Sequence, residues 1–253
     1  MRKAGTIQPG RRVGRLRWWY RRCTQLRASY GAATAVMAAP LVMWRAMAGE
    51  NRDRRWPDPD GRAFDAAHGV ETAGIISLAA LDVAEASWVH GFDYQPVEPI
   101  DFAAVLAPFA IDYPRTTFID LGAGKGRVVM LATGLPFRQV VGVEIAPELA
   151  RVAIANISRY TQAQRADTPW RIVRADAGDY RFPATPLVVF MYNPFTAAIM
   201  HRVLERLRDY RERVGLRVLV IYVRPELEAM WVDAPGFHEV ARTRRYRVYE
   251  SVG

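Results

Sequence analysis

Short apolar runs alternate with amphipathic stretches over residues 118–249, which is the pattern of an α/β protein. The run at 187–192 is unbroken, as expected for a strand buried on both faces of a parallel sheet. The strands that we expect are residues 118–121, 139–144, 170–176, 187–192, 216–223, 238–241 and 246–249. Helical stretches between most of them indicate crossovers between parallel strands.

The helix that we expect after Thr196 illustrates the alternation. Its apolar positions recur at spacings of three and four residues, while charged residues occupy the other faces. A shorter helix is expected at 226–232, and the last two strands are joined by a short link, which predicts an antiparallel pair. We therefore predict an α/β fold with a doubly wound, mostly parallel seven-stranded sheet, an antiparallel C-terminal edge strand and a helical N-terminal lead-in.

The first expected strand carries an acid near its end and runs into a turn with three alternate glycines. Asp120 is followed by Gly122, Gly124 and Gly126. Glycine lets the backbone adopt positive φ and approach a ligand closely, and the N–H groups of the next helix face the same crevice. This arrangement favours a small-molecule cofactor, and S-adenosylmethionine is the one we expect.

A dinucleotide site is the competing interpretation of this turn. It requires the spacing G-x-G-x-x-G, but position 127, where the third glycine would fall, is Arg. Asp120 also places a negative charge where a pyrophosphate would need a positive one, whereas that acid suits the ammonium group of a methionine moiety.

Two further strands end in acids. Glu144 is placed to hydrogen-bond ribose hydroxyls, and Asp176 could accept the exocyclic amine of an adenine ring lying against Ile145 and Ala177. Any one acid could simply cap a helix or end a strand, but all three would lie at the carboxyl ends of parallel strands, where open α/β sheets bind ligands.

The fourth expected strand ends in Tyr192, and Asn193-Pro194-Phe195 follows. An Asn amide oxygen can accept the N–H groups of an amine and so orient its lone pair toward a methyl carbon. Asn193 and Tyr192 are thus the candidate catalytic residues, with Tyr192 and Phe195 as walls of the site. The alternative is an ordinary strand-to-helix turn, with Phe195 packing beneath it.

Residues 114–252 resemble the class I, seven-stranded S-adenosylmethionine-dependent methyltransferases. The segment from Asp120 to Gly126 matches the first motif of that family, Glu144 its ribose acid and Asp176 its adenine-side acid, and 193–195 stands at its fourth motif. Phe195 departs from the Asn/Asp-Pro-Pro-Tyr/Phe of the enzymes that methylate nucleobase and glutamine nitrogens.

The fourth motif is closer to the Asn-Asn-Phe of seven-strand protein-lysine methyltransferases of the disruptor-of-silencing type. Tyr94-Gln95-Pro96 also resembles the segment that precedes the glycine turn in those enzymes, which implies that Tyr94 lies near the methionine end of the cofactor. The resemblance thus implies a protein lysine as the methyl acceptor. Alternatives are a small-molecule amine, an RNA, or a non-catalytic module that binds an adenine ligand.

Charge divides the chain into three expected parts. Residues 1–62 hold 14 Lys and Arg against 4 Asp and Glu, a net charge of +10, whereas residues 63–253 have a net charge of −1. We expect a basic N-terminal segment and linker at 1–61, a helical lead-in at 62–113 and the methyltransferase domain at 114–253. The near-neutral charge of the remainder weakens the case for a nucleic-acid substrate.

The basic segment interleaves arginines with Trp18, Trp19 and Tyr20, a composition that can bind an anionic membrane surface or nucleic acid. A mobile basic tail is the plainer interpretation, and a true start at Met47 is another. The uncharged stretch 28–44 is short for a membrane span and contains Pro40.

The cysteine and histidine content predicts no metal site and a reducing compartment. Cys23 is the single cysteine, and the four histidines have no ligand spacing; His68 and His90 are each followed by glycine. We expect the cytoplasm, with peripheral membrane contact through the basic segment as an alternative.

Overall fold

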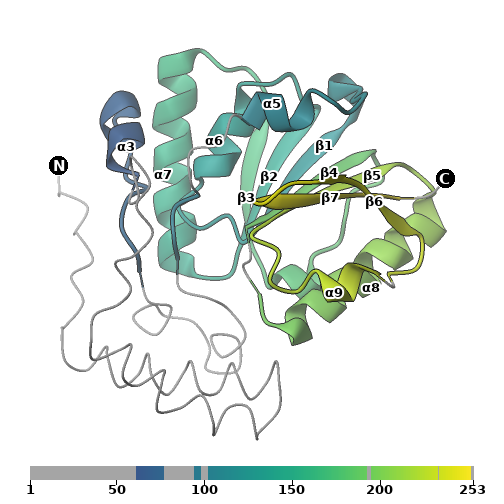
Figure 1. The fold of residues 1–253 in the computed structure, drawn as a ribbon. Coiled ribbons are helices and arrows are strands. Elements are labelled where there is room, and N and C mark those ends of the chain that lie inside the picture. Colours follow the sequence, from purple (N-terminus) through teal and green to yellow (C-terminus); the bar gives the residue numbers. More distant parts are fainter. Residues whose placement is uncertain (1–60, 77–93, 98–101, 193–194, 233, 252–253) are drawn as a thin grey trace, which may run out of the picture.

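The computed structural model describes residues 61–76, 94–97, 102–192, 195–232 and 234–251, which form a sheet covered on both faces by helices (Figure 1). The predicted basic segment 1–61 lies outside the described residues except for Gly61. The seven strands are β1 (Thr117–Leu121), β2 (Gln139–Glu144), β3 (Trp170–Arg174), β4 (Leu187–Tyr192), β5 (Val218–Val223), β6 (Phe237–Arg242) and β7 (Tyr246–Ser251).

The strand order is β3-β2-β1-β4-β5-β7-β6, and β1 to β5 are parallel. The chain moves outward from β1 to β3, then returns to place β4 on the other side of β1. Open α/β sheets bind ligands at such a switch point, beyond the carboxyl ends of the strands. The predicted fold class is confirmed, and the switch point lies between β1 and β4.

The C-terminal hairpin refines the prediction of an antiparallel edge. β7 pairs antiparallel with both β5 and β6, so the last strand lies one position inside the sheet and β6 forms the edge. The helix predicted at 226–232 is shorter in the structure, because residues 226–228 form a turn and the helix spans Ala229–Val232.

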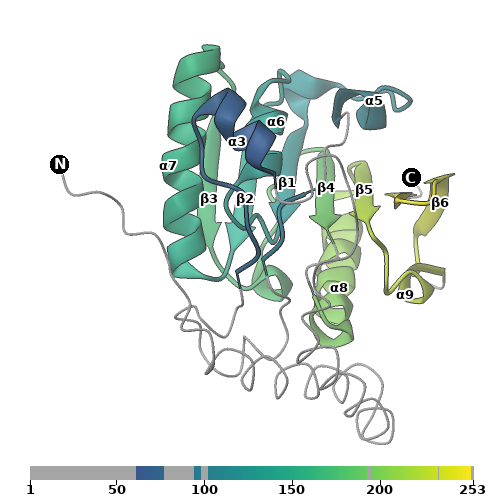
Figure 2. The ribbon, with the colours of Figure 1, turned by 60° about the vertical axis from the view of Figure 1, so that its left-hand side comes forward.

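The helices divide between the two faces of the sheet. They are α3 (Arg62–His68), α5 (Phe102–Leu106), α6 (Arg127–Thr133), α7 (Pro147–Gln164), α8 (Ala197–Val214) and α9 (Ala229–Val232), with short 3-10 turns η2 (Tyr113–Arg115) and η3 (Ala177–Asp179). Helices α5, α6 and α7 lie on one face and α8 and α9 on the other (Figures 1 and 2), and their buried side chains belong to two separate core clusters.

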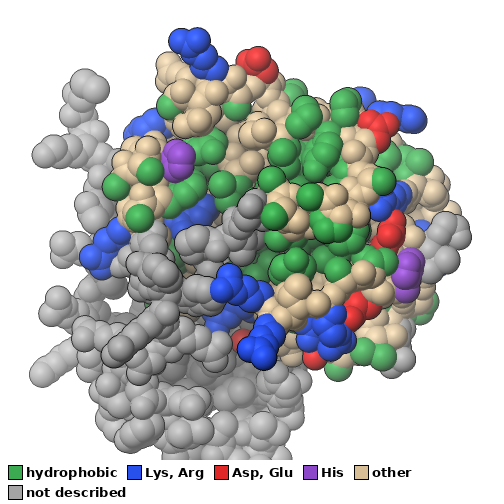
Figure 3. Space-filling view, turned by 45° about the horizontal axis from the view of Figure 1, so that its top comes forward, with side chains coloured by type: hydrophobic (Ala, Val, Ile, Leu, Met, Phe, Trp, Pro, Cys, Tyr) green, Lys and Arg blue, Asp and Glu red, His purple; other side chains and the backbone are tan. Residues whose placement is uncertain are grey.

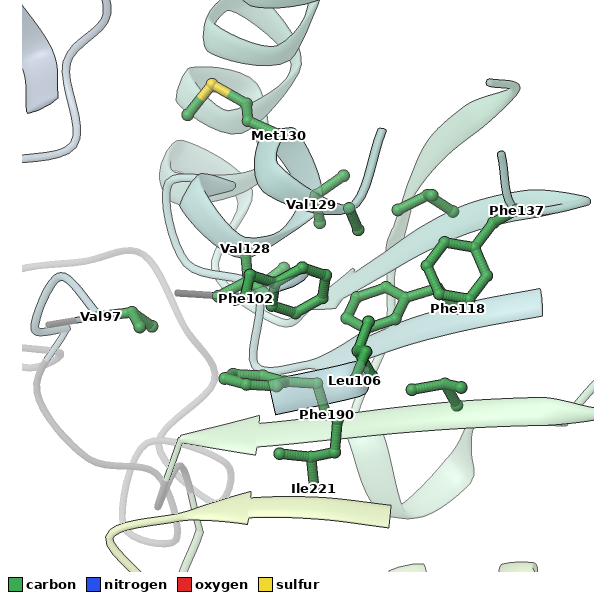
Figure 4. Packing of buried hydrophobic residues seen from close by; sticks show 14 of the residues in the cluster. Val97, Phe102, Leu106, Phe118, Val128, Val129, Met130, Phe137, Phe190 and Ile221 are labelled. Carbon is green, nitrogen blue, oxygen red and sulfur yellow. The ribbon is translucent and has the colours of Figure 1, made fainter. Parts of the chain in front are cut away.

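Aromatic packing fixes α5 on the central strands. Phe102 and Leu106 lie against Phe118 of β1 and Phe190 of β4, and Phe137 joins them from the loop between α6 and β2 (Figure 4). The ring centroids of Phe102 and Phe118 are 5.3 Å apart in an edge-on arrangement. Such pairs stabilise a core beyond the area that they bury, so part of the predicted lead-in is integral to the sheet.

Arg127 joins the remaining lead-in residues to the sheet. It is the first residue of α6 and is 5% exposed. Its guanidinium donates hydrogen bonds to the carbonyl oxygens of Gly61 (3.0 Å) and Val97 (2.9 Å) and to Thr72 Oγ1 (2.9 Å from Nε). One side chain therefore holds three segments that are far apart in sequence.

An acid and a ring complete the surroundings of this guanidinium. Asp65 Oδ1 lies 3.7 Å from Arg127 Nη2, and the ring of Phe64 lies 4.7 Å from Arg127 Cζ. Asp65 in turn accepts hydrogen bonds from the backbone of Thr72 and Ala73, both at 2.7 Å. Each polar group near Arg127 is thus partnered, which is the condition for a buried charge to be tolerated.

We predict that Arg127→Ala lowers the free energy of unfolding by about 3–5 kcal/mol, because Asp65 and the two carbonyls lose their buried donor. Urea denaturation of the full chain measures this change. Arg138→Ala, at an exposed arginine just before β2, is the control and should stay within about 0.5 kcal/mol. Equal stability of the two variants would refute the role of Arg127 as the anchor of the lead-in.

Candidate functional site

The glycine turn between β1 and α6 lies at the switch point of the sheet. Gly122, Gly124 and Gly126 have φ values of 87°, 54° and 85°, in the left-handed region that favours glycine. The backbone N–H groups of Gly122 and Ala123 both donate to the carbonyl oxygen of Val143 at 2.9 Å. The turn itself therefore requires the glycines that the sequence singled out.

Glu144 holds the turn from the end of β2. Its Oε2 accepts a hydrogen bond from the Gly124 N–H and its Oε1 one from the Ala146 N–H, both at 2.8 Å, and the residue is 6% exposed. Burial raises the pKa of Glu144, and the backbone N–H groups partly oppose that shift. Each carboxylate oxygen keeps a lone pair for another donor.

Asp120 differs sharply from Glu144, although both are buried acids at the same edge. Asp120 is 3% exposed, and among the described residues no group donates a hydrogen bond to its carboxylate. Burial, reinforced by the negative charge of Glu144, raises the pKa of Asp120 to about 8. A cationic group placed against this carboxyl would stabilise its ionised form.

Tyr94 lies directly on the glycine turn. A Cβ on Gly124 would come within 2.5 Å of the Tyr94 ring, and the Tyr94 hydroxyl donates a hydrogen bond to the carbonyl oxygen of Thr72 (2.5 Å). Burial raises the pKa of that hydroxyl. The backbone of Tyr94 also pairs with that of Ile76 in an isolated antiparallel bridge, which joins two segments of the lead-in next to the turn.

A polar network attaches this cover to α7 and to the turn. Lys125 Nζ lies 3.1 Å from Glu71 Oε1 and 3.2 Å from the carbonyl oxygen of Ala73. Asn156 on α7, which is buried, donates through Nδ2 to the carbonyl oxygens of Lys125 (3.0 Å) and Glu71 (2.9 Å). The sequence analysis did not select these residues. The available signal was Asn156, a polar residue at an inward-facing position of an amphipathic helix.

The predicted adenine side is assembled around η3. Ile145 follows Glu144 directly, Ala177 is buried, and the Ala175 N–H donates to the carbonyl oxygen of Glu144 at 3.2 Å. Asp176 is already engaged, because one oxygen accepts a hydrogen bond from the Gly178 N–H at 2.8 Å and the other lies 3.3 Å from Arg202 Nη1. Asp176 therefore caps η3 and forms an ion pair with Arg202. Its carboxylate oxygens still have lone pairs for a further donor.

Tyr192 ends β4 and is half-buried, whereas Asn193 lies outside the described residues. Arg224, which the sequence analysis did not select, donates from Nη1 to the Tyr192 hydroxyl at 3.3 Å, and its Cζ lies 5.9 Å from the Tyr192 ring centroid. Arg224 directly follows β5. The rule that sites collect at strand ends could therefore have found it.

The other features considered from the sequence are the histidines, a metal site and a membrane span. His68 packs against the rings of Phe64 and Tyr160, with centroids 4.5 Å and 5.0 Å away. Within the described ranges, no group of three His, Cys, Asp or Glu side chains could hold a metal ion. None of the helices that the structure describes is both long and apolar enough to cross a membrane.

Comparison with known proteins gives weak likenesses. No protein-family model and no curated protein matches the sequence. Among solved structures, a SAM dependent methyltransferase from Aquifex aeolicus is 14% identical, covering 60% of this chain and 90% of that one, with a TM-score of 0.44. A ribosomal protein L11 methylase from Lactobacillus delbrueckii subsp. bulgaricus is 17% identical, covering 59% and 76%, with a TM-score of 0.42.

A third solved structure, a rRNA methylase from Streptococcus thermophilus, is 14% identical, covering 62% of this chain and 98% of that one, with a TM-score of 0.41. Likenesses of this size carry no argument about what this chain does. The fold therefore rests on the sheet described above, and the function on the residues of the site.

We predict that Asp120→Asn changes the pH dependence of stability. The carboxyl has an ordinary pKa of 3.8 when unfolded and about 8 when folded, so between these values the folded state binds more protons and stability falls as the pH rises. Asn stays neutral and removes this loss. The free energy of unfolding of the variant, measured by urea denaturation, should therefore rise relative to that of the wild type from pH 5 to pH 8. Asp167→Asn, at an exposed position, is the control; a constant difference across this range would contradict the prediction.

We predict that Glu144→Gln destabilises the protein in the absence of any cofactor. Both carboxylate oxygens accept backbone N–H groups, whereas an amide must turn its NH₂ toward one of them. A lost hydrogen bond of this kind costs about 1–3 kcal/mol, measured by urea denaturation. Glu212→Gln is the control, because Glu212 forms an exposed ion pair with Arg208 on α8. If Glu144→Gln lowers the free energy of unfolding no more than this control does, Glu144 does not hold the turn.

Proposed function

We propose that this protein is an S-adenosylmethionine-dependent methyltransferase. The observation that carries the proposal is Asp120, a buried carboxyl without a hydrogen-bond donor among the described residues, beside a glycine turn at the switch point of the sheet. A methionine ammonium held there would supply the missing positive charge. A pyrophosphate would instead bring negative charge to this buried carboxyl.

The neighbouring residues fit the rest of the same cofactor. Glu144 keeps lone pairs for ribose hydroxyls, and Ile145 and Ala177 could flank an adenine ring, with Asp176 near its exocyclic amine. Tyr94 covers the turn on the side of Gly124. These residue assignments belong to the proposal.

The same residues disfavour a dinucleotide. Arg127 stands where the third glycine of that motif would fall, and its guanidinium is directed into the lead-in rather than toward the crevice. Asp120, whether protonated or ionised, offers a pyrophosphate no positive charge. An adenine-binding module without catalysis remains the alternative function.

The chemistry proposed for the carboxyl end of β4 is methyl transfer to nitrogen. The cofactor supplies a methyl group on a sulfonium; the nitrogen lone pair forms the new C–N bond as the C–S bond breaks, and the nitrogen loses a proton. Tyr192 would wall the site and Asn193 would orient the acceptor by accepting its N–H groups. The acceptor predicted by resemblance is a protein lysine, with a small amine or RNA as alternatives.

Calorimetric titration of the full chain with S-adenosylmethionine, S-adenosylhomocysteine and NAD tests this proposal. Micromolar affinity for the first two alone is expected, with proton release at pH 6–7 because the cation lowers the pKa of Asp120. The release is read from titrations in two buffers of different ionisation enthalpy and should disappear in Asp120→Asn. Preference for NAD would overturn the proposal.

The catalytic role of Asn193 gives a separate expected outcome. Asn193→Ala should lower turnover by about 100-fold, since misplacing a reactant has an effect of this order, while cofactor affinity survives. Gln164→Ala, at the exposed end of α7, is the control. Methyl transfer to an extract, followed with labelled S-adenosylmethionine, measures both; wild-type turnover in Asn193→Ala would remove Asn193 from the mechanism.

A further inference from the structure

Three arginines lie at the carboxyl end of β4 and β5, beside Tyr192. Tyr192 pairs with Val223, the last residue of β5, and Val223 pairs with Tyr246, the first residue of β7. The turn from β6 to β7 therefore reaches the same edge of the sheet. Arg224 lies at this edge because it directly follows Val223. Arg244 and Arg245 lie there because they are part of the β6–β7 turn.

Backbone contacts hold these residues together. The Arg224 N–H donates to the carbonyl oxygen of Arg245 at 2.7 Å, and Arg224 has a left-handed φ of 49°. A non-glycine residue in that region is strained and persists where its surroundings impose the conformation, often at functional sites. The guanidinium of Arg224 reaches the Tyr192 hydroxyl at 3.3 Å and Gln95 Oε1 at 3.4 Å.

Two of the arginines next to this turn form ion pairs, whereas Arg244 differs from them. Arg242 lies 2.7 Å from Glu239, and Arg247 lies 2.8 Å from Glu228. Arg244 is exposed, and no carboxylate in the described part of the chain is within ion-pair distance of it. Figure 3 shows Lys and Arg side chains gathered in the lower middle of one face, with a few Asp and Glu among them.

We propose that this arginine edge, defined as Arg224, Arg244 and Arg245, binds the phosphates of a single-stranded nucleic acid that is the methyl acceptor. The inference rests on the methyltransferase function proposed above. Guanidinium groups bind phosphate through charge-assisted hydrogen bonds, and a neighbouring aromatic ring can stack on a base. Tyr192, half-buried beside Arg224, is that ring.

The position of Arg224 also bears on the competing acceptor. Its guanidinium lies against Tyr192, so a lysine ammonium approaching the same wall would meet a like charge, whereas a phosphodiester would meet an opposite one. The net charge of −1 over residues 63–253 hides this local concentration. The basic, aromatic composition of residues 1–62 has the character of a second nucleic-acid contact on the same chain.

The test compares two double variants of the full chain. Arg244→Ala/Arg245→Ala removes the exposed part of the edge, and Arg138→Ala/Arg213→Ala removes two exposed arginines at the opposite end of the strands, where β2 begins and α8 ends. Both carry the same change in charge. Fluorescence anisotropy measures binding of RNA and DNA oligonucleotides of one sequence, about 20 nucleotides long, across a range of salt concentrations.

We expect the first variant to bind about tenfold more weakly and its salt dependence to lose about 1.4 in slope, about 0.7 for each phosphate contact. The control should match the wild type. An unchanged affinity and slope in the first variant would overturn the inference. The two oligonucleotides show whether RNA or DNA is the preferred source of the phosphates.

Two further readouts separate this inference from the proposed function. Cofactor affinity, measured by calorimetry on the same variants, should be unchanged, and a wild-type protein that binds no S-adenosylmethionine would refute the methyltransferase and not the phosphate contact. Labelled methyl groups should enter nucleic acid of a cell extract, less so with Arg224→Gln. Label found only in the protein fraction would overturn the inference in favour of a protein acceptor.

Discussion

The buried guanidinium of Arg127 is the interaction on which the candidate site depends. It stands where the chain leaves the glycine turn, and it binds backbone or side-chain groups at Gly61, Thr72 and Val97. Together with the ion pair between Lys125 and Glu71, it connects the lead-in to the residues at the start of α6. Arg127 thus stands where a dinucleotide motif would place its third glycine, and it also anchors the lead-in beside the glycine turn.

Two buried acids next to this turn divide the work between structure and chemistry. Glu144 accepts backbone N–H groups of Gly124 and Ala146, one on each carboxylate oxygen, and Asp120 has no donor among the described residues. Because the two negative charges raise each other's energy, the protein favours a proton on Asp120. The environment rather than the residue type decides which acid is structural and which is available.

The sequence predicted features that depend on neighbouring residues better than features that depend on contacts between distant residues. Apolar runs located the strands, and the spacing of Gly122, Gly124 and Gly126 located the turn, because both depend on neighbouring residues. The anchoring role of Arg127 and the ion pair of Asp176 with Arg202 depend on residues 26 to 66 positions away. Arg224 was overlooked since its neighbours come from three separate segments.

The position of β7 inside the sheet has a consequence for folding order. β5 is apolar and buried along its whole length, yet the strand that covers its outer edge arrives after β6 in the chain. Until the β6–β7 hairpin docks as a unit, β5 presents an unprotected, strongly hydrophobic edge, which is the kind of surface that recruits other chains. The folding protein is therefore most exposed to aggregation before this hairpin docks.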